Sequence, residues 1–279
     1  MEPTLLTSTE VAAILGVTAT TVKRWADAGL LRCVKTAGSH RRFERAEVDR
    51  FRSRPAREAE RAVDSVVEEW LAQLLAPRPV EALAGGLLAA RGRLGSWWRV
   101  AEEIGEALAA LGDRWAGGQL SVLDEHLASE RLARSLARLC EWLPTSPEAP
   151  RSLLVTAVGD DHTIGLSLVE LCLREAGWAT LWGGRRTPSP EVARAIELHR
   201  VRLVVVSASS ASTDGRALAE QAGLLGQSCR LHGARLIVGG RGAWPHRLAY
   251  GEVIRDFATL HEWAQRRGPA GAPATGSSP

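Results

Sequence analysis

Asp160, His162 and Gly165 are the residues of this chain whose types and spacing point most clearly to chemistry. They follow an apolar run at residues 153–158 that predicts a β-strand, and they precede a helical pattern. His162 is therefore expected on a loop at the carboxyl end of a strand, the edge where open α/β sheets bind ligands. An imidazole nitrogen can bind a metal while Asp160 holds the other ring nitrogen and fixes the tautomer. Gly165 would let a bulky group approach the backbone.

A simpler interpretation of these residues is an ordinary surface loop in which Asp160 caps the next helix, because short motifs recur by chance. Two further strand ends argue against it. Ser207 and Ser209 end or follow one apolar run, and Gly239 and Gly240 follow another.

The three strand ends together resemble the cobalamin-binding domain of methionine synthase, corrinoid carrier proteins and cobalamin-dependent mutases. In that family the matching histidine is the lower axial ligand of cobalt, in place of the dimethylbenzimidazole base. The displaced nucleotide tail passes a serine-containing strand end and a Gly-Gly turn. The resemblance implies that His162 binds cobalt, and that the cofactor also contacts the following residues: Asp160, Gly165, Ser207, Ser209, Gly239 and Gly240.

The C-terminal segment shows the alternation of short apolar runs and amphipathic stretches that is typical of a parallel, doubly wound sheet. Strands are predicted at about 152–158, 178–182, 202–206, 234–238 and 252–255, and helices at about 164–176, 189–200, 213–231 and 258–267. We therefore expect a Rossmann-like domain.

The N-terminal segment carries most of the positive charge. Residues 1–54 hold ten Lys or Arg against six Asp or Glu, whereas the remainder holds 25 against 26. Such a basic segment on a neutral body is typical of nucleic-acid binding. Hydroxyl caps and Glu10 start a helix that Gly16 ends, and a second helix is predicted from Ala19 to Ala28. Two helices around a glycine turn predict a helix-turn-helix, with Val22 and Trp25 inward and Thr20, Thr21 and Arg24 towards the major groove.

The residues that follow extend this pattern into a wing. Trp25, Gly29, Leu30 and Leu31 precede a turn at residues 36–39 and then His40, Arg41, Arg42 and Phe43. This arrangement resembles the winged helix-turn-helix of the MerR family. It implies DNA contacts by Lys35, His40, Arg41 and Arg42, with the two arginines on phosphates, while Phe43 and Phe51 fill the core.

The middle segment is rich in Ala, Leu, Glu and Arg, which favours helices. Four are predicted, at about 57–76, 79–92, 97–112 and 119–143, forming a bundle. Within it, the spacing of Trp115 from Glu125 and His126 resembles the helical cap of the light-sensing, cobalamin-dependent repressors of the CarH/LitR type, whose domain order this chain shares. The resemblance implies that these three residues cover the upper face of the corrin and its adenosyl group.

One residue departs from that repressor pattern. Light-sensing members can carry a histidine directly after the capping tryptophan, able to take the upper cobalt position once light has removed the adenosyl group, but Ala116 stands there. Three alternatives stay open: photolysis without that histidine, cobalamin sensing independent of light, or binding of another tetrapyrrole such as haem or a bilin.

The composition indicates a soluble protein. Hydrophobic residues make up 45% and charged residues 24%, and no apolar run approaches the roughly 20 residues that span a bilayer. The N-terminus lacks a signal-peptide pattern, so we expect a cytoplasmic protein. Four scattered cysteines indicate neither a zinc site nor a disulfide framework.

The sequence thus predicts a multidomain protein: a winged helix-turn-helix at residues 1–54, a four-helix bundle at 55–148, a Rossmann-like α/β domain at 149–267 and a disordered tail at 268–279. It is expected to be no enzyme but a repressor that binds adenosylcobalamin and a double-stranded DNA operator, and that forms a dimer or tetramer in response to cofactor and light. A corrinoid carrier protein of a methyltransferase is the competing class, but it would have no need of residues 6–54.

Overall fold

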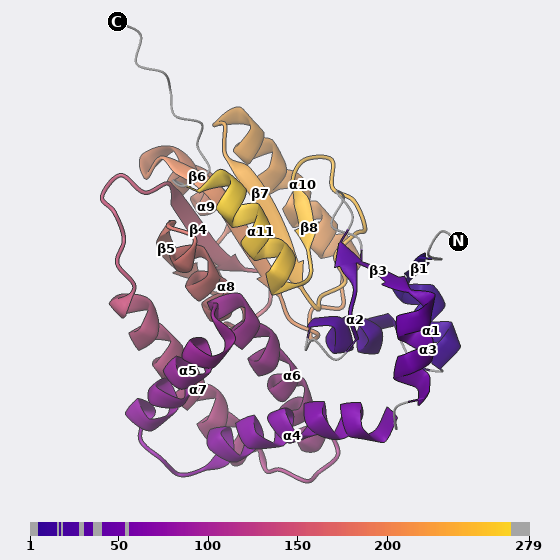
Figure 1. The fold of residues 1–279 in the computed structure, drawn as a ribbon. Coiled ribbons are helices and arrows are strands. Elements are labelled where there is room, and N and C mark those ends of the chain that lie inside the picture. The colour runs from indigo at the N-terminus through magenta and orange to yellow at the C-terminus, as the bar shows by residue number, and fades with distance from the viewer. Residues whose placement is uncertain are drawn as a thin grey trace, which may run out of the picture. The chain divides into compact units, whose positions relative to one another are not determined.

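The computed structural model describes residues 5–15, 17, 19–27, 31–35, 41–53 and 56–268. The chain forms two compact units, Met1–Trp70 and Leu71–Pro279 (Figure 1). The predicted wing turn at 36–39, His40, Gly29, Leu30 and the predicted tail after Gly268 lie outside the described residues. In the described part no helix is long and apolar enough to cross a membrane.

The first unit is a small α/β arrangement around one core. A three-stranded antiparallel sheet has the order β1-β3-β2, with β1 at Leu5–Thr7, β2 at Val34–Lys35 and β3 at Arg41–Glu44. Three helices accompany it, α1 (Ser8–Leu15), α2 (Ala19–Asp27) and α3 (Arg45–Ser53).

The core of this unit confirms the inward residues predicted from the sequence. Val22, Trp25, Phe43 and Phe51 are all buried, and the rings of Trp25 and Phe51 lie 4.9 Å apart. The start of α1 is fixed by a reciprocal pair of hydrogen bonds between Thr7 and Glu10, which satisfies two backbone donors of the first turn.

The second unit begins within α4 (Ala56–Leu75), which is followed by α5 (Val80–Leu94), α6 (Trp97–Ala116) and α7 (Val122–Trp142). These are the four helices predicted from the sequence. Ser121 and Asp124 form a capping box that starts α7, and Gly95 ends α5 in the left-handed conformation that glycine adopts freely.

A five-stranded parallel sheet of order β5-β4-β6-β7-β8 completes the unit. Its strands are β4 (Arg151–Thr156), β5 (Ala179–Gly184), β6 (Val201–Ala208), β7 (Arg235–Gly240) and β8 (Glu252–Ile254). The predicted alternation with helices is confirmed: α8 (Ile164–Glu175), α9 (Ser189–Leu198), α10 (Gly215–Leu231) and α11 (Phe257–Arg267). α8 and α11 pack together on one face of the sheet, and α9 and α10 on the other.

The helical bundle is fastened to the α8 and α11 side of the sheet by carboxylates. Glu175, at the end of α8, accepts hydrogen bonds from the Trp97 amide and from Arg91. Glu102 accepts from the Phe257 amide at the start of α11. The bundle and the sheet therefore belong to one compact unit. The domain boundaries given above from the sequence stay predictions.

Candidate functional site

The strand order places one special point in the sheet. After β4 the chain continues to β5 on one side of the sheet, and after β6 it continues to β7 and β8 on the other side. The connections therefore leave in opposite directions from the neighbouring strands β4 and β6. In open α/β sheets this switch point leaves a crevice at the carboxyl ends of the two strands. The loop after β4 carries Asp160 and His162, and the loop after β6 carries Ser209 and Ser212. These polar residues therefore lie at the position where open α/β sheets bind ligands.

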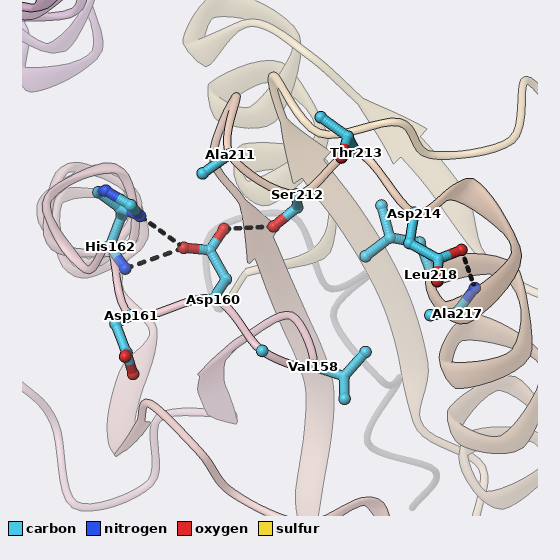
Figure 2. A pocket seen from close by; sticks show the side chains of 11 residues that line it. Val158, Asp160, Asp161, His162, Ala211, Ser212, Thr213, Asp214, Ala217 and Leu218 are labelled. Carbon is cyan, nitrogen blue, oxygen red and sulfur yellow. Dashed lines mark hydrogen bonds and ion pairs between the residues drawn. The ribbon is translucent and has the colours of Figure 1, made fainter.

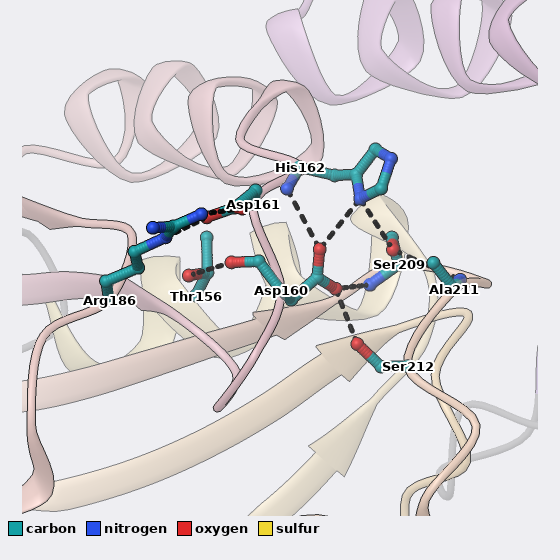
Figure 3. Close-up of polar contacts among 8 residues, drawn as sticks. All are labelled: Thr156, Asp160, Asp161, His162, Arg186, Ser209, Ala211 and Ser212. Atoms are coloured by element: carbon teal, nitrogen blue, oxygen red, sulfur yellow. Dashed lines mark hydrogen bonds and ion pairs between the residues drawn. The ribbon is translucent and has the colours of Figure 1, made fainter.

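Asp160 is the centre of a hydrogen-bond network that joins the two loops (Figure 3). One carboxylate oxygen accepts from the His162 amide and lies 2.9 Å from His162 Nδ1. The other accepts from the Ser209 amide and from the Ser212 hydroxyl, 2.6 Å away. The Thr156 hydroxyl donates to the Asp160 carbonyl. The buried carboxylate is thus fully paired, as a buried charge must be.

Burial by itself would raise the pKa of Asp160. The hydrogen bonds from Ser212, His162 and Ser209 outweigh it and lower the pKa to about 2. Asp160 is therefore a carboxylate throughout the physiological range, and because a carboxylate only accepts, the contact requires a hydrogen on Nδ1 of the His162 ring. The lone pair of the neutral ring is then on Nε2.

This pKa predicts an acid-dependent loss of stability. The carboxyl group of the unfolded chain binds its proton near pH 3.9, but the folded one only near pH 2, so lowering the pH across this window favours unfolding. We expect Asp160 to contribute about 2 kcal/mol above pH 5, and to lose this contribution progressively as the pH falls from about 5 to about 1. Urea unfolding at several pH values should show the difference between the parent and Asp160→Asn shrinking by that amount. A difference that does not depend on pH would contradict the network.

His162 is presented outward from this network. Its side chain is 68% exposed although its partner Asp160 is buried. The Ser209 hydroxyl lies 3.1 Å from the same Nδ1 that faces Asp160. Among the residues that the structure describes, none forms a hydrogen bond with Nε2, and Figure 3 shows this side of the ring turned away from Asp160. An oriented imidazole with a free, exposed nitrogen is suited to bind a metal centre that a ligand brings with it.

The described residues offer no complete metal site of their own. They include no cluster of three or more His, Cys, Asp or Glu side chains with metal-binding geometry.

Beside His162 lies a cavity of about 300 Å³ that is open to solvent (Figure 2). Its walls are the loop after β4 and the start of α10, with Val158 and Leu218 as apolar parts and Asp214 capping the helix. The hollow continues the switch-point crevice along the α10 side of the sheet and offers room for a substituent next to His162.

The four other residues predicted near a cofactor, which lie around the same edge, are Gly165, Ser207, Gly239 and Gly240. The three glycines differ in how much space surrounds them. A Cβ on Gly165 would sit 3.4 Å from the Ser207 hydroxyl, an ordinary contact, so the fold itself tolerates a larger residue there. A Cβ on Gly239 or Gly240 would instead collide with the protein's own carbonyl groups at 2.4 and 2.2 Å. The two strand-end glycines are thus already required by close strand packing.

The residues predicted above the cofactor lie on the bundle. Because Trp97 contacts the end of α8 and Glu102 the start of α11, α6 runs towards the carboxyl edge of the sheet. Its later turns, at about 1.5 Å per residue, continue past that edge to Trp115. α7 starts there and returns, with its last turn held by Arg174 on the Cys140 carbonyl.

The tip formed by these two helices is unusually apolar. Trp115 is 49% exposed, and Val122, Leu123 and Leu127 are more than half exposed. Glu125 and His126 lie among them, with Glu125 accepting a hydrogen bond from Ser129. Exposed apolar groups gathered at one place indicate a contact surface. The tip and His162 lie towards the same edge of the sheet.

Two polar partners of the site were missed by the sequence reasoning. Ser212 donates to Asp160, and the run of serines after β6 was the signal that could have indicated it. Arg186 forms a two-bond ion pair with Asp161, at 2.8 and 2.6 Å, joining the loop after β5 to the His162 loop. Arg186 has a left-handed backbone (φ 59°), unusual for a side-chain-bearing residue, and no sequence pattern marks it.

The residues predicted to contact DNA lie on two elements of the first unit. Thr20, Thr21 and Arg24 belong to α2, the second helix of the helix-turn-helix. Lys35 and Arg41 are paired across β2 and β3, and Arg42 lies next to them on β3. The register thus places two cationic residues opposite each other, and Arg and Lys are residues that can contact phosphate. His40 lies outside the described residues.

Residues 5–55 match a family described as a helix-turn-helix domain. The chain carries a helix-turn-helix domain. It is similar to two curated proteins of Myxococcus xanthus, the HTH-type transcriptional repressors CarA (31% identity over 57% of this chain and 56% of CarA) and CarH (30% over 34% and 31%). The chain therefore spans about half of CarA, and less of CarH.

A third comparison concerns the fold. A monomethylamine corrinoid protein of Methanosarcina barkeri superposes with a TM-score of 0.54 at 17% identity, covering 72% of this chain and 96% of that protein. The predicted multidomain fold is thus confirmed: a helix-turn-helix, a helical region, and an α/β domain with the fold of corrinoid proteins.

Proposed function

We propose that this chain is a DNA-binding transcriptional repressor that binds cobalamin, with His162 as the lower axial ligand of cobalt. The observation that carries the proposal is the geometry of His162: Asp160 holds Nδ1, and the exposed Nε2 faces away from the network at the switch point of the sheet. The resemblance to two repressors and the corrinoid-protein fold support it.

The residues around this point fit such a group. His162 supplies one neutral nitrogen donor, Gly165 leaves the approach to the backbone open, and the cavity beside Asp214 can receive a side arm of the macrocycle. When bound, the corrinoid would supply a cobalt centre with an exchangeable upper ligand. The chain's own part is to orient His162, shield the lower face, and cover the upper face with Trp115, Glu125 and His126.

The adenosyl form, the light response and the change of assembly belong to this proposal. We infer that the upper ligand is adenosyl, because the tip of α6 and α7 exposes Trp115 and three aliphatic side chains that could pack on a nucleoside. Losing that ligand would uncover the tip, and the dimer or tetramer formed with the ligand would then change its size. Since Ala116 cannot bind cobalt, the photoproduct would not hold a second histidine at that position.

Three alternative functions use all or part of this site. A sensor of another tetrapyrrole, or of cobalamin without light, keeps the same site. A corrinoid carrier protein would use the α/β domain alone, which the helix-turn-helix domain argues against.

The experiment is an absorption spectrum of the full chain loaded in the dark with adenosylcobalamin, followed by gel filtration before and after green light. We expect a spectrum without the dimethylbenzimidazole base on cobalt, and a change in size after light. Binding without any change in size would support a light-independent cobalamin sensor. If the chain bound haem or a bilin but not cobalamin, the proposal would be wrong.

A further inference from the structure

Arg131 of α7 holds the end of α4, the helix that leads out of the helix-turn-helix unit. One of its guanidinium nitrogens donates to the carbonyl of Leu74, at 2.8 Å. The other donates to the carbonyls of Ala76 and Arg78. Leu74 lies in the last turn of α4, where a helix leaves its carbonyls without a helical partner, whereas Ala76 and Arg78 lie in the connection that follows. A planar guanidinium can donate to several carbonyls at once.

A second residue on the same face of α7 reinforces this contact. Ser135, four residues after Arg131 and fully buried, donates to the carbonyl of Val80 at the start of α5. The whole connection between α4 and α5 is therefore held by α7. Arg131 is only partly buried. Its main role is therefore to hold this connection in place through hydrogen bonds, and its side chain contributes little to the packing of the core.

The position of Arg131 along the chain joins two functional ends. On one side, Glu125 and His126 lie about 8 to 9 Å earlier along α7, at the apolar tip. On the other side, α4 is continuous across the boundary between the two units, from Ala56 to Leu75. A movement of the first turns of α7 must either carry the end of α4 with it or break the hydrogen bonds of Arg131.

We propose that Arg131 is a positioning residue that couples ligand binding at the tip of α7 to the helix-turn-helix unit through α4. The inference rests on the proposed function, because it assigns the route by which that ligand changes DNA affinity. Such coupling requires one element that both sites bias, and the end of α4 is that element here.

The test compares the full chain with Arg131→Gln, Arg131→Lys and a matched control, Arg138→Gln. Arg138 lies two turns later on the same helix and pairs with Glu81 of α5 instead of with α4. DNA affinity is measured with and without adenosylcobalamin, and cobalamin binding is followed by absorbance. Hydrogen exchange of residues 66–78 is measured in the same samples.

In Arg131→Gln we expect cobalamin binding and folding to be kept, while the ratio of DNA affinities with and without cobalamin falls to near one. Exchange at the end of α4 should become at least tenfold faster. Arg131→Lys should lie between, and Arg138→Gln should match the parent. An unchanged affinity ratio in Arg131→Gln would overturn the proposal.

Failure of the proposed function gives a different pattern. If the parent binds no cobalamin, or if its DNA affinity does not change with cobalamin, the proposed function is wrong. The hydrogen exchange of α4 then still tests whether Arg131 positions this helix. Faster exchange in Arg131→Gln that reaches the part of α4 before Trp70 would support the coupling route. Exchange equal to that of Arg138→Gln would overturn it.

Discussion

Replacing His162 with alanine is expected to remove the protein nitrogen from cobalt and to weaken cobalamin binding by more than the about 10- to 100-fold that is typical of losing only a ligand's hydrogen-bond partner. The physical reason is that Asp160 and Ser209 fix the ring so that Nε2 needs no reorganisation to bind. The measurement is a titration with hydroxocobalamin followed by absorbance, in which the parent and the variant should also differ in spectrum.

Two further variants make that result specific. His232→Ala, at the end of α10 on the opposite edge of the sheet, should bind like the parent. Asp160→Asn keeps the ring but loses the carboxylate that fixes its tautomer, so we expect an intermediate affinity. If His162→Ala bound with parental affinity and an identical spectrum, His162 would not be the axial ligand.

Neutralising Arg41 and Arg42 together is expected to lower DNA affinity at least tenfold and to reduce the slope of log affinity against log salt by about 2. β3 carries both residues, with Arg41 opposite Lys35 and Arg42 opposite Val34, so a phosphate backbone contacted by this strand would lose two cationic partners. The change is Arg41→Gln with Arg42→Gln, measured by fluorescence anisotropy at several salt concentrations.

The matched control removes the same charge from α3. Arg45 and Arg50 are ion-paired with Asp49 and Glu47 on their own helix, so Arg45→Gln with Arg50→Gln should change the salt slope much less. If both double variants lost the same slope, the effect would be one of net charge, and phosphate contacts by β3 would be excluded.

The sequence predicted the second unit well because its signals are local and repeated. Apolar runs of strand length alternate with helical patterns, and each predicted strand and helix from residue 151 onward is present within a few residues. His162 could be placed for the same reason, since a residue that follows a buried parallel strand must lie at the carboxyl edge of the sheet.

What the sequence did not reveal depends on contacts between distant residues. α3, from Arg45 to Ser53, was not predicted, because its charged sequence has few apolar positions, of which Val48 and Phe51 pack inward. The pairing of Asp161 with Arg186 and the hold of Arg131 on α4 join residues 25 and more than 50 positions apart. The periodicity of apolar residues, which predicts helices and strands, cannot predict contacts between such distant residues.

The central claim is that a nitrogen of His162 binds cobalt, and electron paramagnetic resonance of the chain loaded with cob(II)alamin tests it most directly. The unpaired electron of low-spin cobalt(II) lies along the axial direction and couples to the nucleus of the axial donor. With natural histidine each cobalt line should be split into a triplet, and with protein labelled with ¹⁵N in histidine only, into a doublet. Lines that stay a triplet after labelling, or that show no nitrogen splitting at all, would contradict the account.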